Sequence, residues 1–431
     1  MLYRSLNNLA PEVSFKEAVV KGLAPDKGLY FPTYIPELPE SFFQNIESFS
    51  KIEIGTKLLK YFTGEDIPDQ ELEEIISKTI DFPFPLIEIS PDVYTLELFH
   101  GPTLAFKDVG ARFMAGCLSF FNSDLKEQNN TILVATSGDT GGAVANGFYK
   151  KPGIKVVILY PSGKVSELQE KQLTTLGNNI SAIEIDGTFD DCQAIVKKAF
   201  LDESLLSLKL TSANSINVAR WLPQMLYYFY TYQELKKYNK PLVISVPSGN
   251  FGNIGAAVVA QKMGLPIKKL IASTNSNDTV PRFYKDGIYE PTSTKQTISN
   301  AMDVSNPSNF VRIMELFEGI DNSKKYFSSY SFTEAETEAS LRELWEKCNY
   351  LADPHGAVGY LGLKKEMSQH QDSIGIFLET AHPVKFSPAI EKVLKCSPEI
   401  PASTHHLFEL PKKSFKMKEY DEVKTFLQHL W

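Results

Sequence analysis

Lys107 is the residue of this chain whose surroundings best suit covalent amine chemistry. It lies among apolar and small residues in ELFHGPTLAFKD (97–108), directly before the helical pattern VGARFMAGCLSFF. Partial desolvation near a helix N-terminus should lower the pKa of a lysine, which is what a Schiff-base lysine needs. An ordinary first-turn lysine, paired with Asp108 or exposed, is the alternative, and this segment alone does not exclude it.

Two glycine-rich loops are candidates for binding anions. TSGDTGG (136–142) follows the apolar run ILVA, and PSGNFGN (247–253) follows LVISV. Their glycines let the backbone approach a ligand closely, and each loop leads into a helix N-terminus that favours an anion. The pattern predicts two anion pockets, such as one for a phosphate and one for a carboxylate. Glycine-rich turns are also common in α/β proteins, and neither loop fits GxGxxG, so a dinucleotide site is not supported.

The segment SANSINVAR (212–220) could form a third anion site. Its Asn and Ser side chains can surround a phosphate, with Arg220 as a charge-assisted donor. The alternative is a solvated helix start in which Asn214 or Ser215 is the N-cap and Arg220 lies on the surface. The residues alone leave both interpretations open.

A fourth segment, TAHPVKF (380–386), follows the apolar run IGIFLE. A threonine at a strand end can hydrogen-bond a heterocycle nitrogen, which makes Thr380 a candidate ligand contact. His382 and Lys385 are either ligand contacts or turn residues set by Pro383.

From about residue 131, the elements that must position these groups repeat one pattern: an apolar run, then a polar loop, then a helical segment. The runs are short, rich in Val and Ile, and apolar on both faces, which is typical of strands covered on both sides. Their alternation with helices predicts a mostly parallel α/β architecture, whose ligands bind at the carboxyl ends of the strands. The runs are ILVAT (132–136), VVILY (156–160), ISAIEI (180–185), LKLT (208–211), LVISV (242–246), LIAST (270–274) and IGIFLE (374–379).

Residues 1–80 differ from the rest of the chain. They combine a helical segment at 14–22 with a proline-rich stretch at 32–39. We expect a small N-terminal unit over 1–80, packed onto an α/β region over 81–430. That region should contain two interleaved subdomains with soft boundaries.

Composition narrows the class of protein. The 431 residues, 43% of them hydrophobic, suit a folded chain of about two to three domains, and a net charge of −8 argues against non-specific binding to nucleic acid or anionic lipid. Four widely spaced cysteines indicate reduced thiols, and no signal pattern or membrane-length apolar run is visible, so we expect a cytoplasmic protein. HExxH and a complete Walker A loop are missing: YPSGK (160–164) is followed by Val165 where Ser or Thr is required. No metal site is therefore expected, and a nucleotide-binding α/β protein is disfavoured.

Taken together, these segments resemble the threonine synthase family, within the tryptophan-synthase-β-like group of pyridoxal-phosphate enzymes. The combination of GPTLAFKD, SGDTGG and GNFGN is specific, and the early APDKGLYFP resembles the microbial form. The resemblance implies the fold-type II architecture: two mostly parallel open-sheet α/β domains plus a small N-terminal unit. The matching stretches run in order along nearly the whole chain: APDKGLYFP (24–32), LFHGPTLAFKD (98–108), ATSGDTGGA (135–143), SANSINVAR (212–220), PSGNFGN (247–253), MDVSNPSNF (302–310), DPHGAVG (353–359) and TAHPVKF (380–386).

The resemblance also implies a role for each matched residue. Lys107 matches the lysine that binds pyridoxal phosphate, and Thr380 matches the hydroxyl facing the pyridine nitrogen. Asp139 stands where the wider group often has Asn near the cofactor's 3′-oxygen, which leaves its contact open. Gly356 and Val384 depart from the common Thr and Ala without removing an assigned group. The loop for the cofactor phosphate is matched by Gly249, Asn250, Phe251, Gly252 and Asn253; the loop for the substrate carboxylate by Ser137, Gly138, Thr140 and Gly141; and the site for the substrate phosphate by Asn214, Ser215 and Arg220.

The implied reaction converts O-phospho-L-homoserine and water to L-threonine and phosphate. Pyridoxal 5′-phosphate would act as the electron sink, and Lys107 would take the α-proton and shuttle protons at the β-carbon. Two alternatives stay open: a sister enzyme such as a serine/threonine dehydratase or an O-acetylserine sulfhydrylase, and a non-catalytic protein that binds a phosphate ligand. The Arg220 segment argues against the first, and intact Lys107 argues against the second. The choice between monomer and dimer is undecided.

Overall fold

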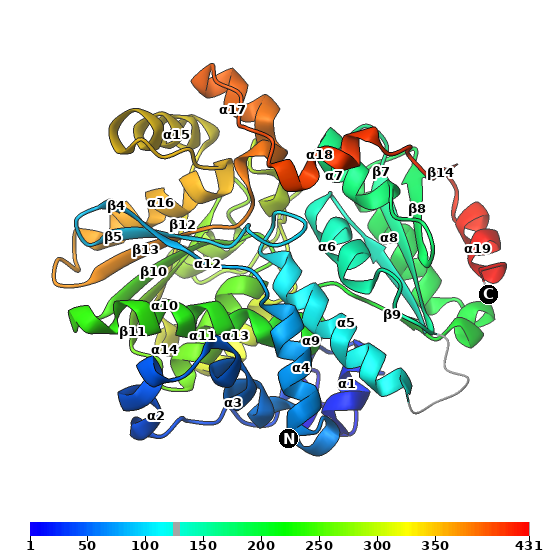
Figure 1. Ribbon diagram of the computed structural model, residues 1–431, viewed down its shortest axis with the longest axis horizontal. Coiled ribbons are helices and arrows are strands. Elements are labelled where there is room, and N and C mark those ends of the chain that lie inside the picture. Colours follow the sequence, from blue (N-terminus) through cyan, green and yellow to red (C-terminus); the bar gives the residue numbers. More distant parts are fainter. Residues whose placement is uncertain (124–129, 431) are drawn as a thin grey trace.

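The computed structural model describes residues 1–123 and 130–430. Figure 1 shows two α/β layers side by side, with α5 (Lys107–Ser123) crossing between them and the N-terminal helices packed below. The predicted arrangement of two mostly parallel open sheets with an N-terminal unit is confirmed.

The first sheet has six strands in the order β12-β11-β10-β13-β5-β4, parallel except for the antiparallel pair β4 and β5. Its central strands are buried along their whole length because α16 lies on one face and α10 and α11 lie below the other (Figure 1). The strands are β4 (Leu86–Ser90), β5 (Val93–Glu97), β10 (Leu242–Pro247), β11 (Ile267–Thr274), β12 (Phe327–Ser331) and β13 (Ile374–Glu379). The helices are α10 (Leu226–Leu235), α11 (Gly252–Lys262), α12 (Thr279–Asp286), α13 (Phe310–Phe317), α14 (Ile320–Ser323), α15 (Glu334–Cys348), α16 (Pro354–Met367) and α17 (Ser387–Leu394).

The second sheet has five parallel strands in the order β14-β8-β7-β6-β9. The C-terminal segment adds strand β14 at its edge, so the last residues of the chain return to a sheet formed much earlier in the sequence. The strands are β6 (Asn130–Ala135), β7 (Ile154–Pro161), β8 (Ile180–Ile185), β9 (Leu210–Thr211) and β14 (Phe415–Met417). The helices are α6 (Asp139–Phe148), α7 (Glu167–Thr174), α8 (Phe189–Leu201), α18 (Ala402–Glu409) and α19 (Tyr420–Gln428).

The N-terminal residues form a small antiparallel sheet, in the order β2-β1-β3, and four helices. The first helix begins where predicted, because the Ser14 side chain accepts a hydrogen bond from the backbone N–H of Glu17. One buried apolar cluster contains Tyr3 of this unit together with Ile132 and Ile244 of the two large sheets, so the unit shares its core with the main body. The elements are β1 (Leu2–Ser5), β2 (Val13–Ser14), β3 (Tyr30–Pro32), α1 (Phe15–Lys21), α2 (Glu40–Asn45), α3 (Lys51–Thr63) and α4 (Asp69–Thr79).

All seven predicted apolar runs are strands, although the run predicted at 208–211 is strand only over 210–211 because the 3-10 helix η3 (Glu203–Leu208) comes before it. Three other connectors matter for the site: α9 (Val218–Trp221), η6 (Asn300–Met302) and η7 (Pro383–Phe386). All four cysteines are free. Across residues 1–123 and 130–430, no helix is long and apolar enough to span a membrane.

Candidate active site

The predicted site residues meet where the two sheets face each other. Residues 136, 248 and 380 directly follow β6, β10 and β13, and Lys107 is the first residue of α5. The segment before Lys107 is joined to the end of β13, since Ala105 and Ala381 form an isolated bridge and the Phe106 N–H donates to the Thr380 carbonyl at 2.9 Å. The carboxyl ends of strands from both sheets therefore supply one site, as the parallel architecture predicts.

Lys107 is largely buried, with 18% of its side chain exposed, and its Nζ lies 3.8 Å from Oδ2 of Asp139. Burial lowers the pKa of Lys107, and the nearby cations Lys385 and Arg220 lower it further, while Asp139 opposes them. The alternative in which Lys107 pairs with Asp108 is wrong. The buried Asp108 carboxylate instead accepts from the Thr103 backbone N–H at 2.9 Å and from the Thr103 hydroxyl at 2.5 Å.

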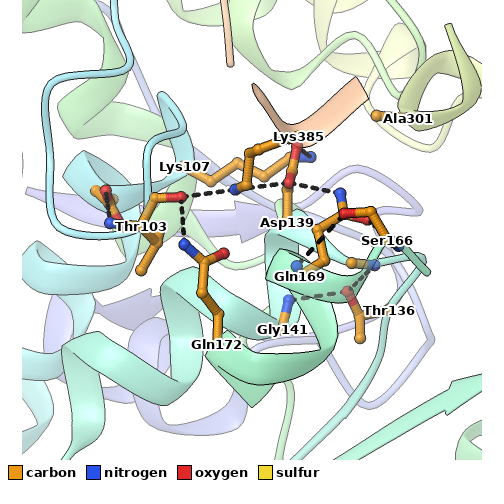
Figure 2. A network of polar contacts seen from close by, with 12 residues as sticks. Thr103, Lys107, Thr136, Asp139, Gly141, Ser166, Gln169, Gln172, Ala301 and Lys385 are labelled. Carbon is orange, nitrogen blue, oxygen red and sulfur yellow. Dashed lines mark hydrogen bonds and ion pairs between the residues drawn. The ribbon is translucent and has the colours of Figure 1, made fainter. Parts of the chain in front are cut away.

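Asp139 is the centre of a buried polar network, shown in Figure 2. Its Oδ1 accepts from Lys385 Nζ at 2.8 Å and from Gln169 Nε2 at 2.9 Å, while Oδ2 faces Lys107. Burial alone would raise the pKa of Asp139, but the two lysines hold it well below its ordinary value. The carboxylate is thus ionised between two amines.

The Thr136 side chain fixes the conformation of the first glycine-rich loop. The Thr136 hydroxyl oxygen accepts from the backbone N–H groups of Gly138 at 2.9 Å and Gly141 at 2.8 Å. The N–H groups of Ser137, Asp139 and Thr140 have no acceptor within the described parts of the chain. These free donors at the start of α6 suit a carboxylate.

Gly138 lets this loop lie against α7. It has φ 134°, and a Cβ on it would lie 2.4 Å from Cδ of Gln169. The Gln169 amide cannot easily turn away, because Gln169 belongs to a capping box in which its Oε1 accepts from the Ser166 N–H at 3.0 Å. Only glycine fits between the loop and the amide that contacts Asp139.

The second glycine-rich loop forms a buried row of backbone donors. None of the N–H groups of residues 249–253 finds an acceptor among residues 1–123 and 130–430. Phe251 has φ 59°, and Gly249 lies so close to residue 302 that a Cβ on it would be 2.6 Å from Cα of Met302. Unpaired buried N–H groups cost free energy unless a ligand accepts from them, so the loop fits a bound phosphate.

The side chains of this loop have more specific partners than the sequence indicated. Asn250 donates from Nδ2 to the Ser215 hydroxyl at 2.9 Å, and Asn309 donates to the same hydroxyl at 3.0 Å. Asn253 accepts at Oδ1 from the hydroxyls of Tyr227 and Tyr228 at 2.5 and 2.6 Å, which leaves its buried Nδ2 without an acceptor. That orphaned donor is a group that a bound anion would satisfy.

Arg220 is buried, with 3% exposure, so the alternative that places it on the surface is wrong. The N-cap of α9 is Asn217, whose Oδ1 accepts from the Ala219 N–H at 3.0 Å, so the alternative N-caps Asn214 and Ser215 are wrong as well. One Arg220 nitrogen donates to the Ala213 carbonyl at 2.8 Å, but Nε has no partner. Burial lowers the pKa of Arg220 to about 10, which leaves it a cation at neutral pH with spare donors.

The TAHPVKF segment divides into three roles. Thr380 is buried, and its hydroxyl makes no hydrogen bond in the described part of the molecule, so it is available to a ligand. His382 is the N-cap of η7 and accepts at Nδ1 from the Val384 N–H at 3.1 Å; burial lowers its pKa to about 4. Lys385 contacts Asp139.

Gln169 was not predicted as a site residue. The S-x-x-Q spacing of its capping box is nevertheless a signal visible in the sequence.

Comparisons with known proteins are consistent over the full length. Residues 83–378 match the family model "Pyridoxal-phosphate dependent enzyme", residues 2–80 match "Threonine synthase N terminus", and residues 356–427 match "Threonine synthase, C-terminal". The threonine synthase of Buchnera aphidicola (subsp. Baizongia pistaciae) is 46% identical over 427 residues, covering 98% of each chain, and that of Escherichia coli is 46% identical over 405 residues, covering 93% of this chain and 92% of its own.

Solved structures agree. The threonine synthase from Escherichia coli superposes with a TM-score of 0.93 at 43% identity over 100% of both chains. The pyridoxal-phosphate-bound threonine synthase from Brucella melitensis gives 0.94 at 34% identity, covering 100% of this chain and 99% of its own. Maize serine racemase, at 14% identity and a TM-score of 0.56 over 76% of this chain and 96% of its own, shares the fold alone.

Proposed function

The chain belongs to the threonine synthase family of pyridoxal-phosphate-dependent enzymes, and we propose that the site around Lys107 carries out the reaction of that family. The reaction converts O-phospho-L-homoserine and water to L-threonine and phosphate. The observation that carries the assignment is the position of Lys107. Its largely buried amine lies beside Asp139, and the preceding residue, Phe106, is hydrogen-bonded to Thr380. A dehydratase-like alternative has no comparable support, because the serine racemase and threonine deaminase structures share the fold alone. The intact Lys107 argues against a non-catalytic alternative.

The residues fit pyridoxal phosphate as the cofactor. The free backbone donors of residues 249–253 would hold its phosphate, with the unpaired Nδ2 of Asn253 beside them. The unpartnered hydroxyl of Thr380 would face the pyridine nitrogen, and the Lys107 amine would bind the cofactor covalently. When bound, the cofactor supplies an electron sink for charge that develops on the substrate carbons.

Two further groups of residues would hold the substrate. The loop formed by Ser137, Gly138, Thr140 and Gly141 at the start of α6 would hold its carboxylate. The donors would be the free N–H groups of Ser137 and Thr140, since the N–H groups of Gly138 and Gly141 already donate to Thr136. Arg220 would bind its phosphate through the unpaired Nε, together with Asn214 and Ser215. Ser215 accepts two hydrogen bonds, so its hydroxyl hydrogen stays free to donate.

Lys107 would move the protons. Its lowered pKa makes the neutral amine accessible, and a neutral amine is what takes the α-proton. The same amine would return protons as phosphate leaves from the γ-carbon and water adds at the β-carbon. The four free thiols support a reducing compartment, the cytoplasm, as the place of action.

The purified protein tests this function. We expect release of phosphate and formation of threonine from phosphohomoserine, with no ammonia from serine or threonine at a comparable rate. Lys107→Ala should lose visible cofactor absorbance and turnover together. Phosphate release at the wild-type rate by that variant would refute the assignment.

A further inference from the structure

Lys385 is a buried cation that the proposed function does not use. It lies in η7, its side chain is fully buried, and its Nζ donates to the Thr103 carbonyl at 2.6 Å as well as to Asp139. Figure 2 shows the Lys385 amine between Thr103 and Asp139, with Gln169 contacting Asp139 from the other side. A buried ammonium is costly unless it is paired, so this position calls for a reason.

The donors around Asp139 are unevenly distributed between its two oxygens. Oδ1 receives both Lys385 at 2.8 Å and Gln169 at 2.9 Å. Oδ2 receives neither, and it lies 3.8 Å from Lys107 Nζ, beyond hydrogen-bond length. The carboxylate is therefore hydrogen-bonded through Oδ1, whereas Oδ2 makes only the longer ion pair with Lys107.

We propose that Lys385 is a positioning residue for Lys107: it neutralises and orients Asp139 through Oδ1, so that the Lys107 amine is left free to react. The proposal rests on the proposed function, in which that amine binds the cofactor and moves protons. If Lys385 were neutral, Lys107 would become the main cation available to a buried carboxylate, and the protonated form of Lys107 would be favoured.

The other charges near this pair do not supply the same effect. Asp108 is engaged by Thr103, and His382 is neutral at pH 7 because burial lowers its pKa to about 4. Arg220 is a second cation that acts on Lys107, but no ion pair joins it to Asp139 within residues 1–123 and 130–430. Lys385 alone combines the charge with a direct contact to Asp139.

The test measures the reactivity of the Lys107 amine in the apoprotein, which lacks the cofactor. Apoprotein is pulse-labelled with an acetylating reagent over a range of pH, and the Lys107 peptide is quantified by mass spectrometry. We expect Lys385→Met to slow labelling of Lys107 about tenfold at a fixed pH below the midpoint, the equivalent of one pKa unit, and to move the midpoint to higher pH. The matched control is Lys392→Met on the exposed face of α17, which should leave the rate unchanged.

Two further variants distinguish positioning from folding. Lys385→Gln keeps a hydrogen-bond donor without the charge and should show the same slowing. In an Asp139→Asn background, Lys385→Met should slow labelling by less than about threefold, because the carboxylate through which Lys385 acts is gone. An unchanged rate in Lys385→Met and Lys385→Gln, or a full tenfold loss in the Asp139→Asn background, would overturn the proposal. Borohydride reduction of wild-type holoenzyme tests the proposed function separately, since it reports whether the cofactor is attached to Lys107 at all.

Discussion

Gly138 offers a sharp test of how the carboxylate loop is built. Gly138→Ala places a Cβ 2.4 Å from the Gln169 side chain on a backbone with φ 134°. Such backbone strain costs about 1–3 kcal/mol, and displacing Gln169 loses a hydrogen bond to a charged group, about 1.5–3 kcal/mol. The sum is roughly 2.5–6 kcal/mol. For 431 residues, the average entropy of unfolding converts this to a fall in Tm of about 3–7 °C.

Gly163→Ala is the matched control. Gly163 also has positive φ, at 66°, but nothing lies within 4 Å of its added Cβ, so it should cost only the left-handed strain of about 1–2 kcal/mol. Thermal melts of both apoproteins and saturation curves with phosphohomoserine are the assays. Gly138→Ala should also raise KM, whereas Gly163→Ala should not. Equal Tm values and equal saturation for the two variants would refute our account of the loop.

Other predictions concern charge. Arg220→Ala should raise KM for phosphohomoserine at least tenfold while the cofactor absorbance persists, and unchanged saturation would exclude Arg220 from the substrate phosphate site. Burial lowers the pKa of Lys107, so the unfolded chain binds more protons than the folded one and Lys107 destabilises the apoprotein below its folded-state pKa. Lys107→Met should therefore raise the apoprotein Tm at pH 7, and the gain should shrink as the pH rises toward the ordinary lysine pKa near 10.4; a gain independent of pH would contradict the lowered pKa.

The sequence alone predicted which segments come together at the candidate site, because these segments have clear local patterns. Both glycine-rich loops and Thr380 directly follow strands that the apolar runs predicted, and Lys107 begins a helix that its own pattern predicted. The carboxyl ends of parallel strands bind ligands, so these residues are expected to lie together. The elements that were missed have weaker local signals. Strand β14, for example, is only three residues long, and its pairing with β8 joins segments far apart in the sequence.

The partners of the site residues could not be predicted, because they come from tertiary contacts. Asp139 follows a strand of one sheet and Lys385 follows a strand of the other. No spacing along the chain predicts that these two residues are in contact. The cap of α9 was also misassigned: SANSIN offers several residues that can cap a helix, and only the structure shows that Asn217 does so while Ser215 turns toward Asn250.

The central claim is that Lys107 carries the cofactor. Borohydride reduction of the holoenzyme, followed by proteolysis and mass spectrometry, tests it most directly. Our account predicts a reduced pyridoxyl phosphate on the peptide containing Lys107, and its loss when excess phosphohomoserine is added before reduction. Labelling of any other lysine, or of none in a protein that still forms threonine, would contradict it.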